Sequence, residues 1–238
     1  METLSVEAIE KLLRCVNPVF EDLEPSQGKD EYVFRGSSFN VSFHGRLYLI
    51  TAGHVVSGWP VANLRVFDLV TRNSLPFKGF HPRKSAEDTD DVAVFEIETE
   101  MLNADELTRL SPIVLDRQEA FRSQGLPRGG LFAVKGYPRV RGQVIVETAT
   151  ITNKPYEITG RDGGGLYAGL HSALYFIDIP ITDLDGMSGA PWIVAGAETT
   201  SSLSQLAGLH ISAAHSGEDI GGIFITASGL LKRLKEIE

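Results

Sequence analysis

The fold is indicated most clearly by the stretch Leu47-Tyr48-Leu49-Ile50-Thr51-Ala52-Gly53-His54. It opens with apolar and β-branched residues, which favour a buried strand. Gly53 then marks the point where the chain must bend. His54 therefore follows the end of a strand, where a rigid sheet can hold a reactive side chain in place.

Short strand-like runs of the same kind continue along most of the chain after residue 32. They are rich in Val, Ile, Phe, Tyr or Thr, and glycines separate them. The predicted strands are 38–44, 46–52, 63–69, 92–97, 131–135, 143–152, 173–178, 190–195, 204–212 and 221–226. So many short strands with little helix between them favour β-barrels or sandwiches over a parallel α/β sheet. The polar segment 117–130 divides them into two similar sets.

Amphipathic helices are predicted at both ends of the chain. Residues 4–16 carry apolar side chains at helical spacing, and Asn17-Pro18 would end that helix. The polar stretch 21–31 is expected to be a linker or surface loop. Residues 228–238 place Leu230, Leu231, Leu234 and Ile237 on one face of a second helix.

Composition and charge exclude several classes of function. A chain of 238 residues with 42% hydrophobic residues can bury a sizeable core. Its net charge of −9 disfavours binding to nucleic acid. No apolar run is long enough to span a membrane, and the start lacks the features of a secretory signal. Because Cys15 is the single cysteine, we expect a cytoplasmic protein without an internal disulfide.

Two further segments place reactive side chains where an apolar strand meets a turn. Asp90-Asp91 opens the apolar run 92–97, and Asp91 is preferred as the functional carboxylate because it directly precedes that run. Ser188 lies within Asp185-Gly186-Met187-Ser188-Gly189-Ala190-Pro191-Trp192. The glycines around this serine allow a tight turn in which backbone N–H groups can converge.

Histidine, aspartate and serine are together the residues that nucleophilic acyl transfer requires. A serine hydroxyl such as that of Ser188 becomes nucleophilic when an imidazole, here His54, takes its proton. A carboxylate, here Asp91, must hold the imidazole in the correct tautomer. The N–H groups of Gly186 and Ser188 are the expected donors to the oxyanion.

Three motifs resemble those of trypsin-like (chymotrypsin-fold) serine peptidases. They are Thr51-Ala52-Gly53-His54 for the TAAH/TAGH box, Asp91-Val92-Ala93-Val94 for the DIAL/DLAV box, and Gly186-Met187-Ser188-Gly189-Ala190-Pro191 for the GDSGGP box. The resemblance runs from about Phe34 to the C-terminal helix. It implies an all-β fold of two antiparallel six-stranded β-barrels, with the triad His54, Asp91 and Ser188 between them. The expected divisions are 1–30 (helix and linker), 31–116 (first barrel) and 117–238 (second barrel and C-terminal helix).

The chain also departs from the secreted members of that family. Those members pair a cleaved N-terminus with an aspartate just before the serine, but Met187 occupies that position here. Activation by that ion pair is therefore excluded. Either the site forms in the uncleaved chain, or a partner orders it.

The resemblance leaves two substrate preferences open. Gly208-Leu209-His210 is similar to the Gly-Ile-His of members that prefer glutamate or glutamine, which implies that His210 lines the substrate pocket. Thr182, Asp183 and Asp185 fall on the opposite wall, and an acidic wall would suit arginine or lysine instead.

We therefore expect a serine endopeptidase that acts on protein or peptide substrates without a cofactor or metal ion. A cytoplasmic endopeptidase must be restrained, so narrow specificity or a regulatory protein partner is also expected. The alternative is a catalytically silent peptide-binding module that retains the cleft. The glycine-rich segment 160–166 is expected to be a mobile loop, since it lacks the ending of a phosphate-binding loop.

Overall fold

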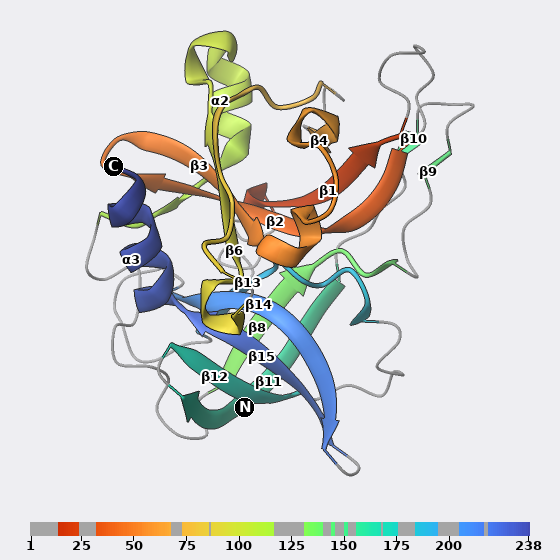
Figure 1. Ribbon diagram of the computed structural model, residues 1–238, viewed down its shortest axis with the longest axis vertical. Coiled ribbons are helices and arrows are strands. Elements are labelled where there is room, and N and C mark those ends of the chain that lie inside the picture. The colour runs from red at the N-terminus through yellow and green to blue at the C-terminus, as the bar shows by residue number, and fades with distance from the viewer. Residues whose placement is uncertain are drawn as a thin grey trace.

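The two large sheets in the described part of the chain lie one above the other, with a helix beside their junction (Figure 1). The computed structural model describes residues 14–23, 32–67, 73–85, 87–116, 131–139, 144–145, 150–151, 156–167, 169–175, 184–194, 205–216 and 219–238. Both sheets are barrel-like, so the predicted all-β fold is confirmed, and the architecture is consistent with a chymotrypsin-like fold.

The first sheet is an open half-barrel built around the strand that ends before His54. Its six main strands are antiparallel in the order β4-β1-β2-β3-β6-β5, and β7 pairs in parallel with β2. The strands are β1 (Val16–Asp22), β2 (Tyr32–Phe43), β3 (Arg46–Ala52), β4 (Leu64–Val66), β5 (Phe77–His81), β6 (Val92–Ile97) and β7 (Ile113–Val114). A short helix, α2 (Ala104–Leu110), begins with a capping box between Asn103 and Glu106.

The second sheet closes into a barrel of six strands. The order around the barrel is β11-β12-β15-β14-β13-β8. These strands are β8 (Leu131–Gly136), β11 (Tyr156–Tyr167), β12 (Leu170–Tyr175), β13 (Pro191–Val194), β14 (Gln205–Ser216) and β15 (Asp219–Thr226). A separate two-stranded ribbon consists of β9 (Val144–Ile145) and β10 (Thr150–Ile151).

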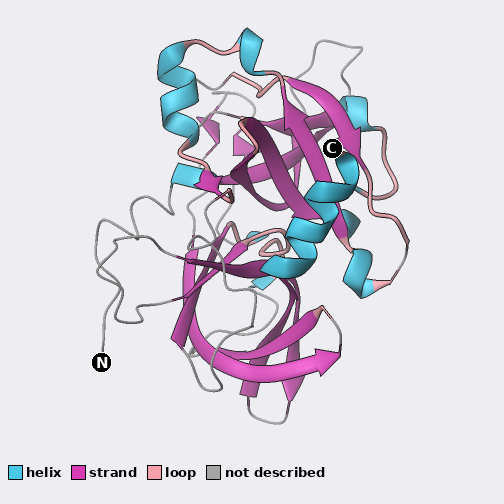
Figure 2. Ribbon diagram, turned by 90° about the vertical axis from the view of Figure 1, so that its left-hand side faces the viewer, coloured by secondary structure: helices cyan, strands magenta, loops and turns pink. Residues whose placement is uncertain are grey.

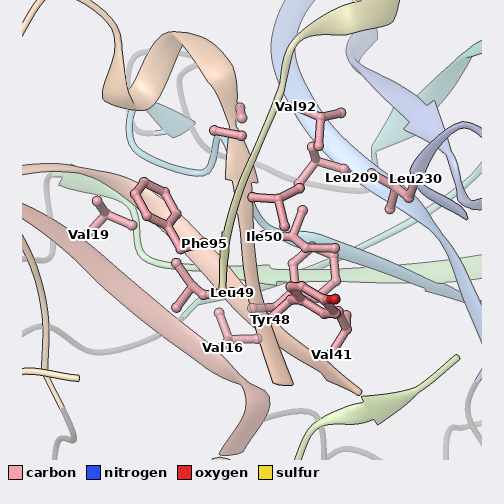
Figure 3. Packing of buried hydrophobic residues seen from close by; sticks show 14 of the residues in the cluster. Val16, Val19, Val41, Tyr48, Leu49, Ile50, Val92, Phe95, Leu209 and Leu230 are labelled. Carbon is pink, nitrogen blue, oxygen red and sulfur yellow. The ribbon is translucent and has the colours of Figure 1, made fainter. Parts of the chain in front are cut away.

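The C-terminal helix is confirmed as α3 (Ala227–Ile237), and it joins the two sheets. Thr226 caps it by accepting a hydrogen bond from the Gly229 N–H. Figure 2 shows the helix beside the junction, and Figure 3 shows its Leu230 near Leu209 of β14 and Val92 of β6. Because one apolar cluster contains residues of both sheets and α3, the strands that carry the site cannot shift independently.

The predicted helix and linker near the N-terminus differ from the structure at their boundaries. Residues 4–13 of the expected helix lie outside the described residues, and residues 14–15 are helical as predicted. Its last residue, Val16, instead begins strand β1. Glu21 and Asp22, expected in a linker, end the same strand, where ion pairs with arginines of β2 and β4 allow their burial.

The glycine-rich segment expected to be a mobile loop lies within strand β11. A Cβ at Gly160 would lie 2.4 Å from the Leu174 carbonyl oxygen and 2.5 Å from the Phe132 ring. Glycine is therefore required here by close strand packing rather than by mobility.

No helix in the described part of the chain has both the length and the apolar character needed to cross a membrane.

Candidate active site

His54 and Asp91 lie against each other at one end of the first sheet. His54 lies in the short 3-10 turn that follows β3, and Asp91 directly precedes β6, which pairs with β3. The Asp91 Oδ2 atom lies 2.6 Å from His54 Nδ1, and Asp91 Oδ1 accepts the His54 backbone N–H at 2.7 Å. One carboxylate therefore holds both the ring and the backbone of the histidine, which defines the ring orientation. Asp90 instead accepts a hydrogen bond from Ser85 Oγ at 2.7 Å.

Ser188 lies in a tight turn between the two sheets. The Met187 N–H donates to the Leu184 carbonyl at 3.0 Å, and the Ala190 N–H donates to the Met187 carbonyl at 2.9 Å. Gly186 and Gly189 have φ values of +94° and +91°, which favour glycine. The glycines that flank Ser188 in the sequence are thus required by the backbone of this turn.

The first sheet holds this turn through Ser37 of β2, which is fully buried. Its N–H donates to the Ser188 carbonyl at 2.8 Å, and its hydroxyl donates to the Gly186 carbonyl at 2.9 Å. The same hydroxyl accepts the Tyr137 N–H of the second barrel at 2.8 Å. Ser37 therefore connects the serine turn to both halves of the protein. Nothing in the local sequence around Ser37 indicates this role, because its contacts lie far away in the chain.

The Ser188 hydroxyl donates to the Ile211 carbonyl at 3.0 Å in this structure. His54 lies near Ser188, as the surroundings of Gly36 show. A Cβ at Gly36 would lie 2.8 Å from Val55, the residue after His54, and 3.0 Å from the Ser188 carbonyl oxygen. The structure thus brings the three predicted residues into one region, with His54 and Asp91 already bonded. A rotation about the Ser188 Cα–Cβ bond would release the hydroxyl from Ile211.

The Gly186 and Ser188 N–H groups have no hydrogen-bond acceptor among the described residues. A Cβ at Gly186 would lie 2.4 Å from the Phe34 ring and 2.8 Å from the Tyr137 carbonyl oxygen. The turn is therefore closely packed at Gly186, against Phe34 and the Tyr137 backbone. Two N–H groups without a partner beside a serine are the kind of donors that stabilise an oxyanion.

His210 of β14 lies directly beside the serine turn. Its carbonyl accepts the Gly189 N–H at 2.8 Å, and its N–H donates to the Ala190 carbonyl at 2.9 Å. The side chain is buried, and backbone groups of Met187 and Ser212 lie close to the ring without forming hydrogen bonds of good geometry. Burial lowers the pKa of His210 to about 4; the backbone groups oppose this effect in part, and the neighbouring His54 adds to it. At neutral pH this imidazole is uncharged and can still donate one hydrogen bond.

The opposite wall of the expected substrate pocket is described only in part. Thr182 and Asp183 lie outside the described residues. Asp185 is exposed and forms an ion pair with Arg139 at 3.0 Å. The one described carboxylate of this wall therefore already has a cationic partner.

A polar hollow of about 390 Å³ adjoins His54 and Gly186. Both sheets contribute to its lining, which consists of Phe34, Arg35, His54, Val55, Ser57, Gly58, Trp59, Arg139, Asp185 and Gly186. A substrate chain that passes the serine turn would have room here. Among the described residues, no group of three or more His, Cys, Asp or Glu side chains is arranged to hold a metal ion.

A comparison of this chain with protein-family models and with curated proteins gives no match. The case for a function therefore depends on the geometry of the site and on the three motifs.

Proposed function

We propose that this protein is a serine endopeptidase that cleaves peptide bonds through an acyl-enzyme. The observation that carries the proposal is the position of His54. Its ring is held by Asp91 at 2.6 Å, and it lies near a glycine-flanked serine turn whose two N–H groups have no partner among the described residues. Met187 precedes the serine in this arrangement, which supports activity without the N-terminal ion pair of the secreted enzymes. The single cysteine supports a reducing compartment such as the cytoplasm.

The chemistry starts when the Ser188 hydroxyl turns from the Ile211 carbonyl toward the Nε2 atom of His54. The serine oxygen attacks the substrate carbonyl carbon while its proton moves to His54, and Asp91 stabilises the resulting imidazolium. The Gly186 and Ser188 N–H groups donate to the oxyanion, and losing one such donor costs about 3 kcal/mol of barrier. His54 then protonates the leaving amine, the C–N bond breaks, and water hydrolyses the ester by the reverse proton path.

We further propose that the enzyme prefers glutamine or glutamate on the acyl side of the cleaved bond. The uncharged, buried imidazole of His210 supports this preference, because it can donate a hydrogen bond to a side-chain carbonyl or carboxylate. The Arg139–Asp185 ion pair argues against the alternative preference for arginine or lysine.

A defined peptide library tests this reading, with cleavage sites identified by mass spectrometry. Cleavage is expected mainly after glutamine and glutamate, and the Ser188→Ala protein should cleave nothing. Cleavage only after basic residues would contradict the role of His210 while leaving the endopeptidase intact. Equal cleavage by the Ser188→Ala protein would reveal a contaminating enzyme and contradict the proposed nucleophile.

The second candidate is a catalytically silent peptide-binding module. The hydrogen bond of Ser188 Oγ to the Ile211 carbonyl favours it, because in this state the hydroxyl does not contact His54. An endopeptidase that a regulatory partner switches on would show the same resting state. The two candidates differ in whether Ser188 ever becomes nucleophilic.

A further inference from the structure

Arg83 lies beside the carboxylate that holds His54. Its guanidinium NH1 is 3.7 Å from Asp91 Oδ1, the oxygen that also accepts the His54 backbone N–H. The Asp91 side chain is 8% exposed and that of Arg83 is 33% exposed, so the ion pair is only partly screened by water. Within the described structure, Arg83 is the one cationic side chain that forms an ion pair with Asp91.

The chain makes room for Arg83 at Gly53, immediately before His54. A Cβ at Gly53 would lie 2.8 Å from Arg83 Cβ, 2.9 Å from Arg83 Cδ and 2.9 Å from Asp91 Oδ1. The φ angle of Gly53 is not positive, so backbone conformation does not require glycine there. The absence of a side chain instead lets the stem of Arg83 pack over the backbone beside the histidine.

The C-terminal helix fixes the segment that carries Arg83. Arg233 of α3 donates a hydrogen bond to the Pro82 carbonyl, and Glu236 of α3 forms an ion pair with Lys84. These contacts flank Arg83 on both sides in the sequence. The segment that carries Arg83 is therefore held from outside the first sheet, by a helix that packs on both sheets.

We propose that Arg83 is a positioning residue for the His54–Asp91 pair, an inference that rests on the proposed function. Its guanidinium faces Asp91 Oδ1 together with the His54 backbone N–H, so that Oδ2 remains directed at the His54 ring. Loss of Arg83 would leave the carboxylate freer to rotate. Asp91 would then hold the imidazole less firmly in the orientation that Ser188 needs.

The other charged groups around the His54–Asp91 pair are the same in wild type and in a variant that lacks Arg83. On the His54 side, Arg35 pairs with Glu21 and Arg139 pairs with Asp185, while His210 is uncharged at neutral pH. On the Arg83 side, Asp90 bonds to Ser85, and Lys84 pairs with Glu236. Each of the other cations in this set already has an acidic partner. None of them can therefore take the place of Arg83 as the partner of Asp91.

The test compares wild type with Arg83→Met, Arg83→Lys and Lys78→Met. Lys78→Met is the control, because it removes a cation of β5 that pairs with Glu96 rather than with Asp91. A fluorophosphonate measures the rate of Ser188 modification. Arg83→Met should react about fivefold more slowly. Arg83→Lys should recover most of this loss, and Lys78→Met should react at the wild-type rate.

A second readout does not depend on activity. The His54 Nδ1–H proton is followed by NMR with and without the Arg83→Met change, both in the Ser188→Ala background. Its exchange with water should be faster on loss of Arg83, because Asp91 then holds the ring less firmly. If wild type is labelled but Arg83→Met keeps the same labelling rate and the same exchange rate, the role of Arg83 is overturned. If wild type is never labelled, the proposed function fails, and the exchange rate alone then supports or overturns Arg83.

Discussion

Replacement of Asp91 by asparagine is expected to slow peptide cleavage about 10⁴-fold while the protein stays folded. The reason lies in the two contacts of the carboxylate. The His54 backbone N–H requires an oxygen at the Oδ1 position, so the amide nitrogen must face His54 Nδ1. The imidazole then carries its proton on Nε2 and cannot accept the proton of Ser188. The measurement is kcat/KM on a peptide that the wild type cleaves.

Asp90→Asn is the matched control for this variant. Asp90 precedes Asp91 directly but bonds to Ser85, so its replacement should change kcat/KM less than about threefold. The outcome that contradicts the account is the reverse pattern, in which Asp90→Asn inactivates the enzyme and Asp91→Asn does not.

Gly189→Ala is expected to destabilise the protein by about 4 kcal/mol or more. A Cβ at this position would lie 1.8 Å from the Ser37 carbonyl oxygen and 2.6 Å from Thr51 Oγ1. Neither neighbour can move easily, since the Thr51 hydroxyl donates to that same carbonyl at 2.7 Å within the buried first sheet. The free energy of unfolding, measured with urea, gives the loss directly.

Gly58→Ala is the control that separates the cost of the steric overlap at Gly189 from the cost of placing alanine at a positive φ. Gly58 has a φ of +89°, close to the +91° of Gly189, but a Cβ there would meet nothing within 4 Å. It should therefore cost only about 1 kcal/mol. Equal losses for the two variants would show that Gly189 is not packed against β2 as described.

Each residue of the proposed triad could be selected from the sequence because it lies in a short contiguous motif. His54 follows an apolar strand, Asp91 precedes one, and Ser188 lies between glycines. These local patterns have local structural causes, such as the positive φ values on both sides of Ser188. The predicted C-terminal helix has the same origin, since its apolar face is visible at helical spacing.

The contacts that join the motifs could not be predicted from local patterns. Ser37 binds the serine turn from a strand far away in the chain, and Arg83 reaches Asp91 across the space left at Gly53. Glu21 and Asp22 were wrongly expected in a linker, because the ion pairs that allow their burial in β1 come from neighbouring strands. These contacts depend on long-range packing, which residue periodicity and short motifs do not reveal.

The nucleophilicity of Ser188 is the central claim, and labelling of the purified protein with a fluorophosphonate tests it most directly. Intact mass counts the adducts, and the Ser188→Ala protein is measured beside the wild type. The account predicts one adduct on the wild type and none on the variant, which would mean that His54 and Asp91 activate the serine in the chain as it stands. A folded wild type that takes up no adduct, or an adduct that persists in Ser188→Ala, would contradict it.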